Sequence, residues 1–322
     1  MLGQQSDSAK SRGVFGEKMR EEQKNFRSGF VAIIGRSNAG KSTLLNRLTG
    51  EKIAIVSPKP QTTRNKIAGI LTTPDYQIVF EDTPGIFRGK GGLFQYMKRS
   101  WEAAAEDTDA IVFVIDGTKP LRAADFELLA SLEGKGAPVI AAVNKTDAAR
   151  KEDIFPVLAR LNELKYLSEI IPLSAKKGEN CDLLLEKLVS LLPEGCAFYP
   201  EDEITDKSER FIAAEVIREK ILLNLDEEVP HGVGINVVKY SFDEGRGILD
   251  IDAEIYCERD NHKAILIGKE GNMLKKIGAA ARFELEKNLG QKVFLNLFVK
   301  VRRDWRDNDN YLRDLGYNRK EV

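Results

Sequence analysis

The 322-residue sequence has few thiol and imidazole groups, since it contains only three cysteines and two histidines. The cysteines, Cys181, Cys196 and Cys257, show no CxxC spacing and are interpreted as incidental thiols in a reducing compartment. With His231 and His262 as the only histidines, a zinc site and a Ser/His/Asp triad are both disfavoured.

The sequence also has neither a large excess of one charge nor a long apolar run. The formal net charge of −1 argues against a histone-like polyanion binder, so any nucleic-acid site must be local. No apolar run approaches the roughly 20 residues that span a bilayer, and the first 28 residues lack the apolar core of a secretory signal. The default expectation is a cytoplasmic protein.

The chain is long enough for two domains, because single cores usually stop growing at roughly 250 to 300 residues. In the first part, six short apolar runs alternate with helix-like stretches, which predicts an α/β domain with a mostly parallel, six-stranded sheet covered by helices on both faces. A nucleotide would bind at the carboxyl ends of its strands. The runs are FVAIIG, IAGIL, YQIVFED, AIVFVID, PVIAAVNK and EIIPLSA.

A break in the periodicity, LPEGCAFYPEDEITD at residues 192–206, predicts a linker. Beyond it the pattern is α-β-β-α-α-β, with a hairpin turn at residues 243–247, and indicates an α+β module with an antiparallel sheet face. We therefore expect a flexible extension at 1–28, a first domain at 29–193, a linker at 194–207, a second domain at 208–307 and a C-terminal tail at 308–322.

A glycine-rich loop follows the first predicted strand and precedes a predicted helix. It fits G-x-x-x-x-G-K-[ST], in which backbone N–H groups curl around phosphates. Lys41 is expected to reach the β and γ phosphate oxygens, and the Ser42 hydroxyl to coordinate Mg²⁺. The predicted nucleotide-binding residues here are Gly35, Arg36, Ser37, Asn38, Ala39, Gly40, Lys41, Ser42 and Thr43.

The segment NKTD at residues 144–147 follows the fifth predicted strand and resembles the base-recognition motif of Ras-like GTPases. The Asp147 carboxylate can accept hydrogen bonds from guanine N1–H and the exocyclic amine, whereas adenine offers neither donor there. A buried acceptor left unmatched costs about 1–3 kcal/mol, so this carboxylate selects guanine. Asn144 would brace the phosphate loop and Lys145 would lie along the base. The predicted site is completed after the sixth strand by Ser174, Ala175 and Lys176.

Two further segments predict a switch. Asp82, at the end of the third predicted strand, would hold a water on Mg²⁺, and the Gly85 N–H would contact the γ-phosphate. The segment KPQTTR at residues 59–64 is the predicted effector loop; by similarity to the TTR segment of related GTPases, Thr63 is the second Mg²⁺ ligand, the alternative being an ordinary turn. Loss of the γ-phosphate would release both loops.

Several segments together resemble the Era family of bacterial ribosome-associated GTPases, from Phe30 to Tyr317: PEGCAFYPEDEITD, RFIAAEVIREKILLNLDEEVPHGVGI, NHKAILIGKEGNMLKKIGAAAR and VFLNLFVKVRRDWRDN. The resemblance implies a Ras-like P-loop GTPase domain followed by a type II KH domain that binds RNA. It implies a monomer that acts in assembly of the small (30S) ribosomal subunit and binds the single-stranded 3′ end of 16S rRNA when GTP is bound. Peripheral contact with the inner membrane is implied as well.

The GKEG turn is the predicted RNA-binding element. Its glycines would let the phosphate backbone of about four nucleotides approach, while a helix N-terminus and nearby cations supply positive potential. The alternative is a helix–turn–helix with solvated lysines. The predicted RNA-binding residues are Lys263, Gly268, Lys269, Glu270, Gly271, Lys275, Lys276, Arg302 and Arg303.

Hydrolysis is expected to be slow, because Ile86 follows Gly85 where Ras-like enzymes carry the glutamine that orients water. The residues expected to act in it are Lys41, Asn38, Thr63 and Gly85. Asn38 has two interpretations, a ligand for a K⁺ ion or a residue that stabilises the loop. A rival for the whole chain is a GTPase whose second domain binds a protein or a membrane surface. A tRNA-modifying GTPase is another, but neither its cofactor-binding partner domain nor its catalytic cysteine is found.

Overall fold

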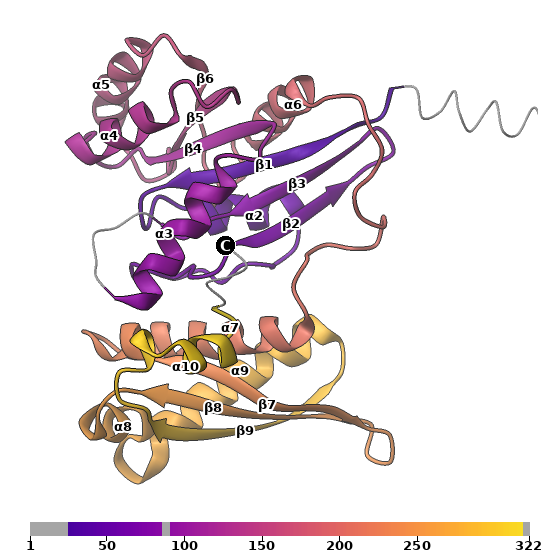
Figure 1. Cartoon of the computed structure of the whole chain (residues 1–322), viewed down its shortest axis with the longest axis vertical. Helices are drawn as coiled ribbons and strands as arrows, with labels where there is room; N and C mark the ends of the chain where they lie inside the picture. The colour runs from indigo at the N-terminus through magenta and orange to yellow at the C-terminus, as the bar shows by residue number, and fades with distance from the viewer. Residues whose placement is uncertain (1–24, 86–90, 318–322) are drawn as a thin grey trace, which may run out of the picture.

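The computed structural model describes residues 25–85 and 91–317 as two domains, one above the other in Figure 1. The first domain holds a six-stranded sheet in the order β2-β3-β1-β4-β5-β6, in which only the β2–β3 pair is antiparallel. The predicted mostly parallel sheet is thus confirmed. Its elements are β1 (Arg27–Gly35), α2 (Lys41–Thr49), β2 (Ile67–Thr72), β3 (Tyr76–Asp82), α3 (Gly92–Ala104), β4 (Ala110–Asp116), α4 (Ala123–Leu132), β5 (Val139–Asn144), α5 (Lys151–Asn162), β6 (Leu167–Pro172) and α6 (Cys181–Leu191).

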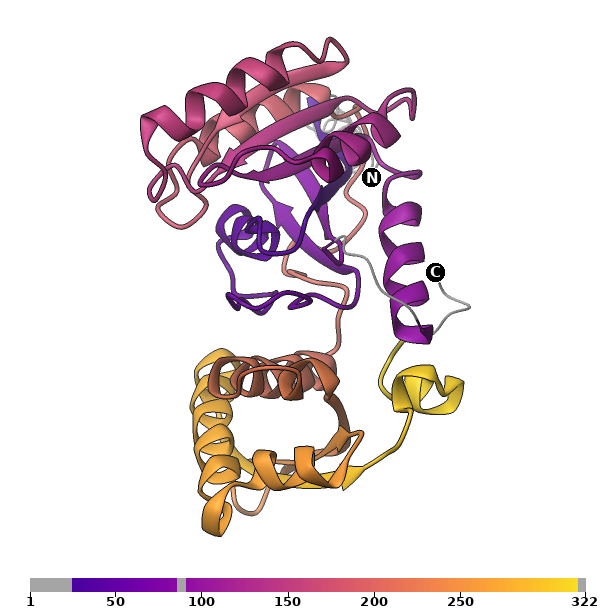
Figure 2. The ribbon, with the colours of Figure 1, turned by 90° about the vertical axis from the view of Figure 1, so that its left-hand side faces the viewer.

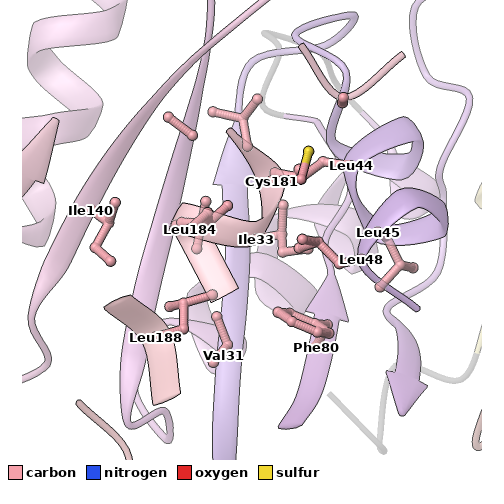
Figure 3. Packing of buried hydrophobic residues seen from close by; sticks show 14 of the residues in the cluster. Val31, Ile33, Leu44, Leu45, Leu48, Phe80, Ile140, Cys181, Leu184 and Leu188 are labelled. Atoms are coloured by element: carbon pink, nitrogen blue, oxygen red, sulfur yellow. The ribbon is translucent and has the colours of Figure 1, made fainter. Parts of the chain in front are cut away.

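Alternate residues of β1 pack into two hydrophobic cores on opposite faces of the sheet. Val31 and Ile33 pack with Leu44 of α2 and Leu184 of α6, as Figure 3 shows, whereas Ala32 and its alternating neighbours face the cluster under α4 and α5. Side chains point to opposite sides of a strand in turn, so a strand buried on both faces is apolar throughout. Each fully buried aliphatic side chain contributes about 1.5–3 kcal/mol, and this packing fixes the strand ends that carry the loops.

The second domain packs three helices on a three-stranded sheet, β7-β8-β9. Its elements are α7 (Glu209–Asn224), η2 (Val229–Gly232), β7 (Gly234–Asp243), β8 (Ile248–Cys257), α8 (Asp260–Ile267), η3 (Lys269–Gly271), α9 (Asn272–Leu289) and β9 (Lys292–Val301). The prediction of an antiparallel face is right for β7 and β8 but wrong for β9, which pairs parallel to β8. The reason is the connection between the two strands: α8 and α9 return the chain to the beginning of β8, so β9 runs in the same direction as β8.

The predicted linker is bound to the first domain. Ile70 N donates to Ile204 O (2.9 Å), and Thr205 Oγ1 donates to Ala68 O (2.7 Å), so residues 204–206 run along the open edge of β2. Asp206 accepts from Ala68 N at 3.0 Å. An exposed strand edge presents unpaired N–H and C=O groups, and this segment covers them.

The ends of the predicted domains differ from the structure. Arg27 and Ser28, assigned to the extension, belong to β1, and residues 1–24 lie outside the described part. The predicted tail contains α10 (Asp309–Asp314), which follows η4 (Trp305–Asp307). Leu312, Leu315 and Tyr317 are buried with residues of α3, because their apolar side chains gain from leaving water. Within 25–85 and 91–317, no helix has the length and apolarity that a membrane crossing needs.

Candidate functional site

The phosphate loop joins β1 to α2, and its lysine folds back over it. Lys41 is 6% exposed, and its Nζ donates to Gly35 O (3.1 Å) and Arg36 O (3.3 Å). Burial lowers the pKa of Lys41, and Asp82 opposes that effect. Gly40 has φ +100°, and a Cβ there would come 2.2 Å from Asn144 Nδ2, so the position requires glycine. The buried cation is therefore placed where phosphate oxygens would meet it.

Three oxygen-bearing side chains converge beside this lysine. Ser42 Oγ lies 2.7 Å from Asp82 Oδ2 and 2.8 Å from Thr63 Oγ1, and Thr63 Oγ1 lies 3.1 Å from the same carboxylate oxygen. Asp82 Oδ1 is buried without a hydrogen-bond partner among the described residues. Burial raises the pKa of Asp82, which the charge of Lys41 and these hydroxyls oppose. Hard oxygen donors with an unsatisfied carboxylate oxygen fit Mg²⁺.

The predicted base-recognition residues come together at the ends of β5 and β6. Asn144 Nδ2 donates to Ala39 O at 2.9 Å, which ties the motif to the phosphate loop. Asn144 Oδ1 accepts from Ala175 N, also at 2.9 Å. Ser174 Oγ donates to Asp147 Oδ1 at 2.7 Å and so orients the carboxylate. This hydrogen bond would present the Asp147 carboxylate to a guanine base in a fixed orientation.

Two residues that the sequence analysis missed complete this region. Lys145 Nζ bonds to Asn38 O (2.6 Å) and to Asp116 Oδ2 (2.8 Å), so Asp116 fixes the lysine that would lie along the base. Arg47 bonds to the carbonyls of Ala175 (3.1 Å) and of Lys176, whose side chain is exposed. Asp116 ends a predicted strand, a position that could have indicated it. Arg47 follows the lysine motif by six residues and carries no pattern of its own.

The remaining predicted residues line one cleft between the phosphate loop and the effector loop, with Thr43 on its wall. A Cβ on Gly85 would lie 2.7 Å from Ser37 Cα, so the two loops nearly touch. Asn38 has φ 65°, and its Nδ2 donates to Pro58 O at 2.6 Å, a contact that stabilises both loops. Arg36 instead points to Asp125 (3.3 Å). Ile86 lies outside the described residues.

The GKEG turn lies between α8 and α9, and three of its residues have positive φ: Gly268 (71°), Glu270 (55°) and Gly271 (76°). The predicted lysines around it form no ion pair with any described residue. They are the half-buried Lys263 and the exposed Lys269, Lys275 and Lys276, and Arg303 is exposed as well.

Arg302, also predicted to bind RNA, packs against two tyrosine rings. Its guanidinium lies 5.6 Å from the ring centroids of both Tyr256 and Tyr311, and its Nε is buried without a partner among the described residues. Such stacking on aromatic faces stabilises the contact between β8 and α10. The sequence pattern does not separate this arginine from the exposed Arg303.

Comparisons with known proteins match both domains. Residues 30–145 match a family described as 50S ribosome-binding GTPase, and residues 228–306 match the KH domain. The chain is 51% identical to GTPase Era of Caldicellulosiruptor saccharolyticus over 92% of its own length and 99% of the relative. It is 47% identical to GTPase Era of Ruminiclostridium cellulolyticum, with 91% and 98% covered.

Two solved structures of Era are similar over 91% of this chain and 99% of theirs, each at 40% identity. One is a variant from Aquifex aeolicus bound to GDP and AlF₄⁻, with a TM-score of 0.87. The other is Era in complex with MgGDPNP and nucleotides 1506–1542 of 16S ribosomal RNA, with a TM-score of 0.88. The six-stranded nucleotide domain, the KH domain and these relatives agree, and the chain belongs to the Era family of GTPases.

Proposed function

We propose that this protein is a Mg²⁺-dependent, slowly hydrolysing GTP switch of the cytoplasm. In this proposal its KH domain binds the single-stranded 3′ end of 16S rRNA during assembly of the small ribosomal subunit. The observation that carries the proposal is the GKEG turn with nearby lysines that form no ion pair within the described part of the chain. The same chain holds the predicted guanine-nucleotide residues. A chain with a net charge of −1 needs such a local patch to bind RNA.

In the nucleotide site, each residue has a distinct task. Asp147 binds the guanine edge, Lys41 neutralises the β and γ phosphates, and the Gly85 N–H contacts the γ-phosphate. Ser42, Thr63 and the Asp82 carboxylate would hold Mg²⁺, directly or through a water. When bound, the ion neutralises charge on the phosphate oxygens. Because Thr63 lies on the effector loop, loss of the γ-phosphate changes the contacts that keep this loop in place.

In the KH domain, the open turn and the start of α9 would accept the RNA backbone. Positive φ at Gly268 and Gly271 turns the chain tightly before the helix, whose first N–H groups point toward the loop. Lys269 and Lys275 add charge beside it. Backbone contacts of this kind position single-stranded RNA, and the bases are then read in the adjacent groove.

Filter binding tests the proposal. A single-stranded RNA with the 3′-end sequence of 16S rRNA should be retained more tightly with a non-hydrolysable GTP analogue than with GDP. A scrambled RNA of equal length is the control. Affinity should fall as salt rises, because cations on the protein displace counterions from the phosphates. Flotation with anionic liposomes, together with no retention of RNA, would favour the membrane-binding alternative.

Three further features belong to the same proposal. We propose that a K⁺ ion bound by Asn38 supplies positive charge during hydrolysis, since the glutamine of Ras-like enzymes is absent at Ile86. The contact between Asn38 and Pro58 supports the other interpretation, stabilisation of the loop. Peripheral contact with the inner membrane and a monomeric state rest on the family resemblance, and flotation and light scattering test them.

A further inference from the structure

The effector loop is held against the second domain along most of its length. We call residues 56–66 the switch segment. Val56 N donates to Glu219 Oε1 (2.9 Å), and Lys59 Nζ donates to Leu225 O and to Asp226 Oδ1 (2.9 Å). Figures 1 and 2 both show α7, the helix that carries Glu219, lying on the side of the second domain that faces the first. The loop that senses the nucleotide is therefore also part of the contact between the domains.

The contacts become tightest on either side of Thr63. The carbonyl of Thr62 accepts a hydrogen bond from the Arg218 guanidinium. On the other side, Arg64 donates to Val233 O (2.6 Å) and His231 O (2.8 Å). Thr63 itself is 6% exposed, and its hydroxyl lies in the oxygen cluster of Ser42 and Asp82. A residue whose two neighbours are both held by hydrogen bonds has little freedom to shift its backbone.

The surroundings of Arg218 hold its guanidinium in place for the contact with Thr62. It is 1% exposed, and its guanidinium is paired with Glu215 of the same helix through two nitrogens. The fork with the carboxylate fixes the plane of the guanidinium, and the second nitrogen of the fork reaches the Thr62 carbonyl as well. Burying two charges is unfavourable unless they are paired and hydrogen-bonded. Apolar residues could fill the same space, but they could not bind a backbone carbonyl.

We propose that Arg218 is a positioning residue of the GTPase site, supplied by the KH domain: through the Thr62 carbonyl, it holds Thr63 where that side chain completes the Mg²⁺ site of the GTP-bound state. This inference rests on the proposed role of Thr63 as a Mg²⁺ ligand. GDP binding does not depend on it, because the ligand from the switch segment is needed only while the γ-phosphate is present.

The test uses the full chain with Glu215→Leu and Arg218→Met together. The double change removes the bond to Thr62 without leaving a buried carboxylate unpaired, and apolar replacement of a buried pair is often tolerated. We expect kcat to fall about tenfold and the Mg²⁺ concentration for half-maximal turnover to rise, with GDP affinity unchanged. The single variant Arg218→Lys, which keeps Glu215, should recover less than half of the rate that the double variant loses, because an ammonium lacks the planar fork of a guanidinium.

Arg246→Met is the control, because it removes an arginine of the KH domain that pairs with Asp243 and Asp250 and does not contact the switch segment. Circular dichroism establishes that each variant is folded. A folded double variant with wild-type kcat and wild-type Mg²⁺ dependence would overturn the inference. Thr63→Ala separates the two proposals: if its Mg²⁺ dependence is normal, the proposed role of Thr63 fails. If Thr63→Ala is impaired and the double variant is not, only the role of Arg218 fails.

Discussion

We propose that the Asp147 carboxylate distinguishes guanine from other bases, and Ser174 Oγ donates a hydrogen bond to it at 2.7 Å. Asp147→Asn replaces one acceptor by a donor, which matches the oxygen of xanthine instead of the amine of guanine. We expect preference to shift from GTP toward XTP by roughly 100-fold, from the mismatch of buried hydrogen bonds. Competition of both nucleotides against a fluorescent GDP measures it. If the preference stays with GTP, another residue reads the base.

The side chain of Lys41 is buried against the phosphate loop, and its charge opposes the effect of burial on the pKa of Asp82. Lys41→Ala should weaken GTP binding by roughly 100-fold or more, because charge-assisted hydrogen bonds to phosphate are lost and backbone amides alone cannot neutralise the β and γ charge. Titration with a fluorescent GTP analogue measures the affinity. Lys177→Ala, which removes an exposed lysine from the neighbouring loop, is the control. Wild-type affinity in Lys41→Ala would refute the site assignment.

Asn38 separates two interpretations of the hydrolysis step. If it binds K⁺, turnover should be severalfold faster in K⁺ than in Na⁺ buffer, and Asn38→Ala should lose that difference, because the amide oxygen is gone. If it only bonds Pro58 at 2.6 Å, both salts give equal rates and the variant is slower in both. Steady-state turnover at matched ionic strength distinguishes them. Equal rates in the wild-type protein would exclude the K⁺ proposal.

The two glycines of the GKEG turn differ in how well they would tolerate a side chain, and this difference decides which of them can be used to test RNA binding. Gly268 has φ +71° and ψ 174°, and a Cβ there would meet Met273 Cβ at 2.7 Å. Gly268→Asp therefore strains the turn itself, besides any effect on RNA. Gly271 has φ +76° and ψ 9°, and the nearest atom to its added Cβ is Lys275 Cε at 3.9 Å. Aspartate and asparagine tolerate this left-handed conformation.

Gly271→Asp should weaken binding of single-stranded RNA about tenfold or more, because it places a carboxylate against the phosphates. GTP affinity should be unchanged, since Gly271 belongs neither to the nucleotide site nor to the contacts with the switch segment. Gly271→Asn is the matched control, with the same shape and no charge. Filter binding at two salt concentrations measures both variants. Equal loss in both would mean that bulk and not charge matters; no loss in either would remove this turn from the RNA site.

In the second domain, the positions of the strands could be predicted from the sequence, but the direction of β9 could not. Short apolar runs predict the positions of β7, β8 and β9 well, because strand-forming composition is a local property of each segment. The direction of β9 is not local, since it depends on how far α8 and α9 carry the chain. A sequence pattern contains the first kind of information and not the second.

At the scale of the molecule, the nucleotide site was largely predictable, while the contacts between the domains were not. Motifs such as Gly35 to Ser42 carry their chemistry at fixed spacing and lie at strand ends, so their convergence follows from the parallel sheet. Arg64 and Arg218 lie 154 positions apart and resemble surface arginines in the sequence. Only the three-dimensional arrangement shows both to be 1% exposed at the same interface. Tyr317 is a similar case, because its partner Tyr96 is distant in the chain.

A closed ring of four charges also joins the domains. Lys52 of the first domain and Lys220 of α7 each contact both Glu219 and Glu284, with Lys52–Glu219 at 2.9 Å and Lys220–Glu219 at 2.7 Å. Burial alone would raise the pKa of Glu284, but hydrogen bonds from Lys220 and Lys52 bring it below the ordinary value of 4.5. The ring is partly exposed, so its contribution to stability is about 1 kcal/mol.

Because the pKa of Glu284 is lower in the folded than in the unfolded protein, its contribution is fully present above about pH 4.5 and is lost as the pH falls through the folded value. Glu284→Gln should therefore lower the Tm at pH 7 by a few degrees at most, and the difference from wild type should shrink toward pH 3. Asp243→Asn, which removes a half-buried carboxylate of the β7–β8 hairpin from its pair with Arg246, is the control for loss of a paired carboxylate outside the contact between the domains. Thermal unfolding at a series of pH values measures the difference. If the wild-type advantage over Glu284→Gln is as large at pH 3 as at pH 7, the carboxylate of Glu284 does not stabilise the contact between the domains through its charge.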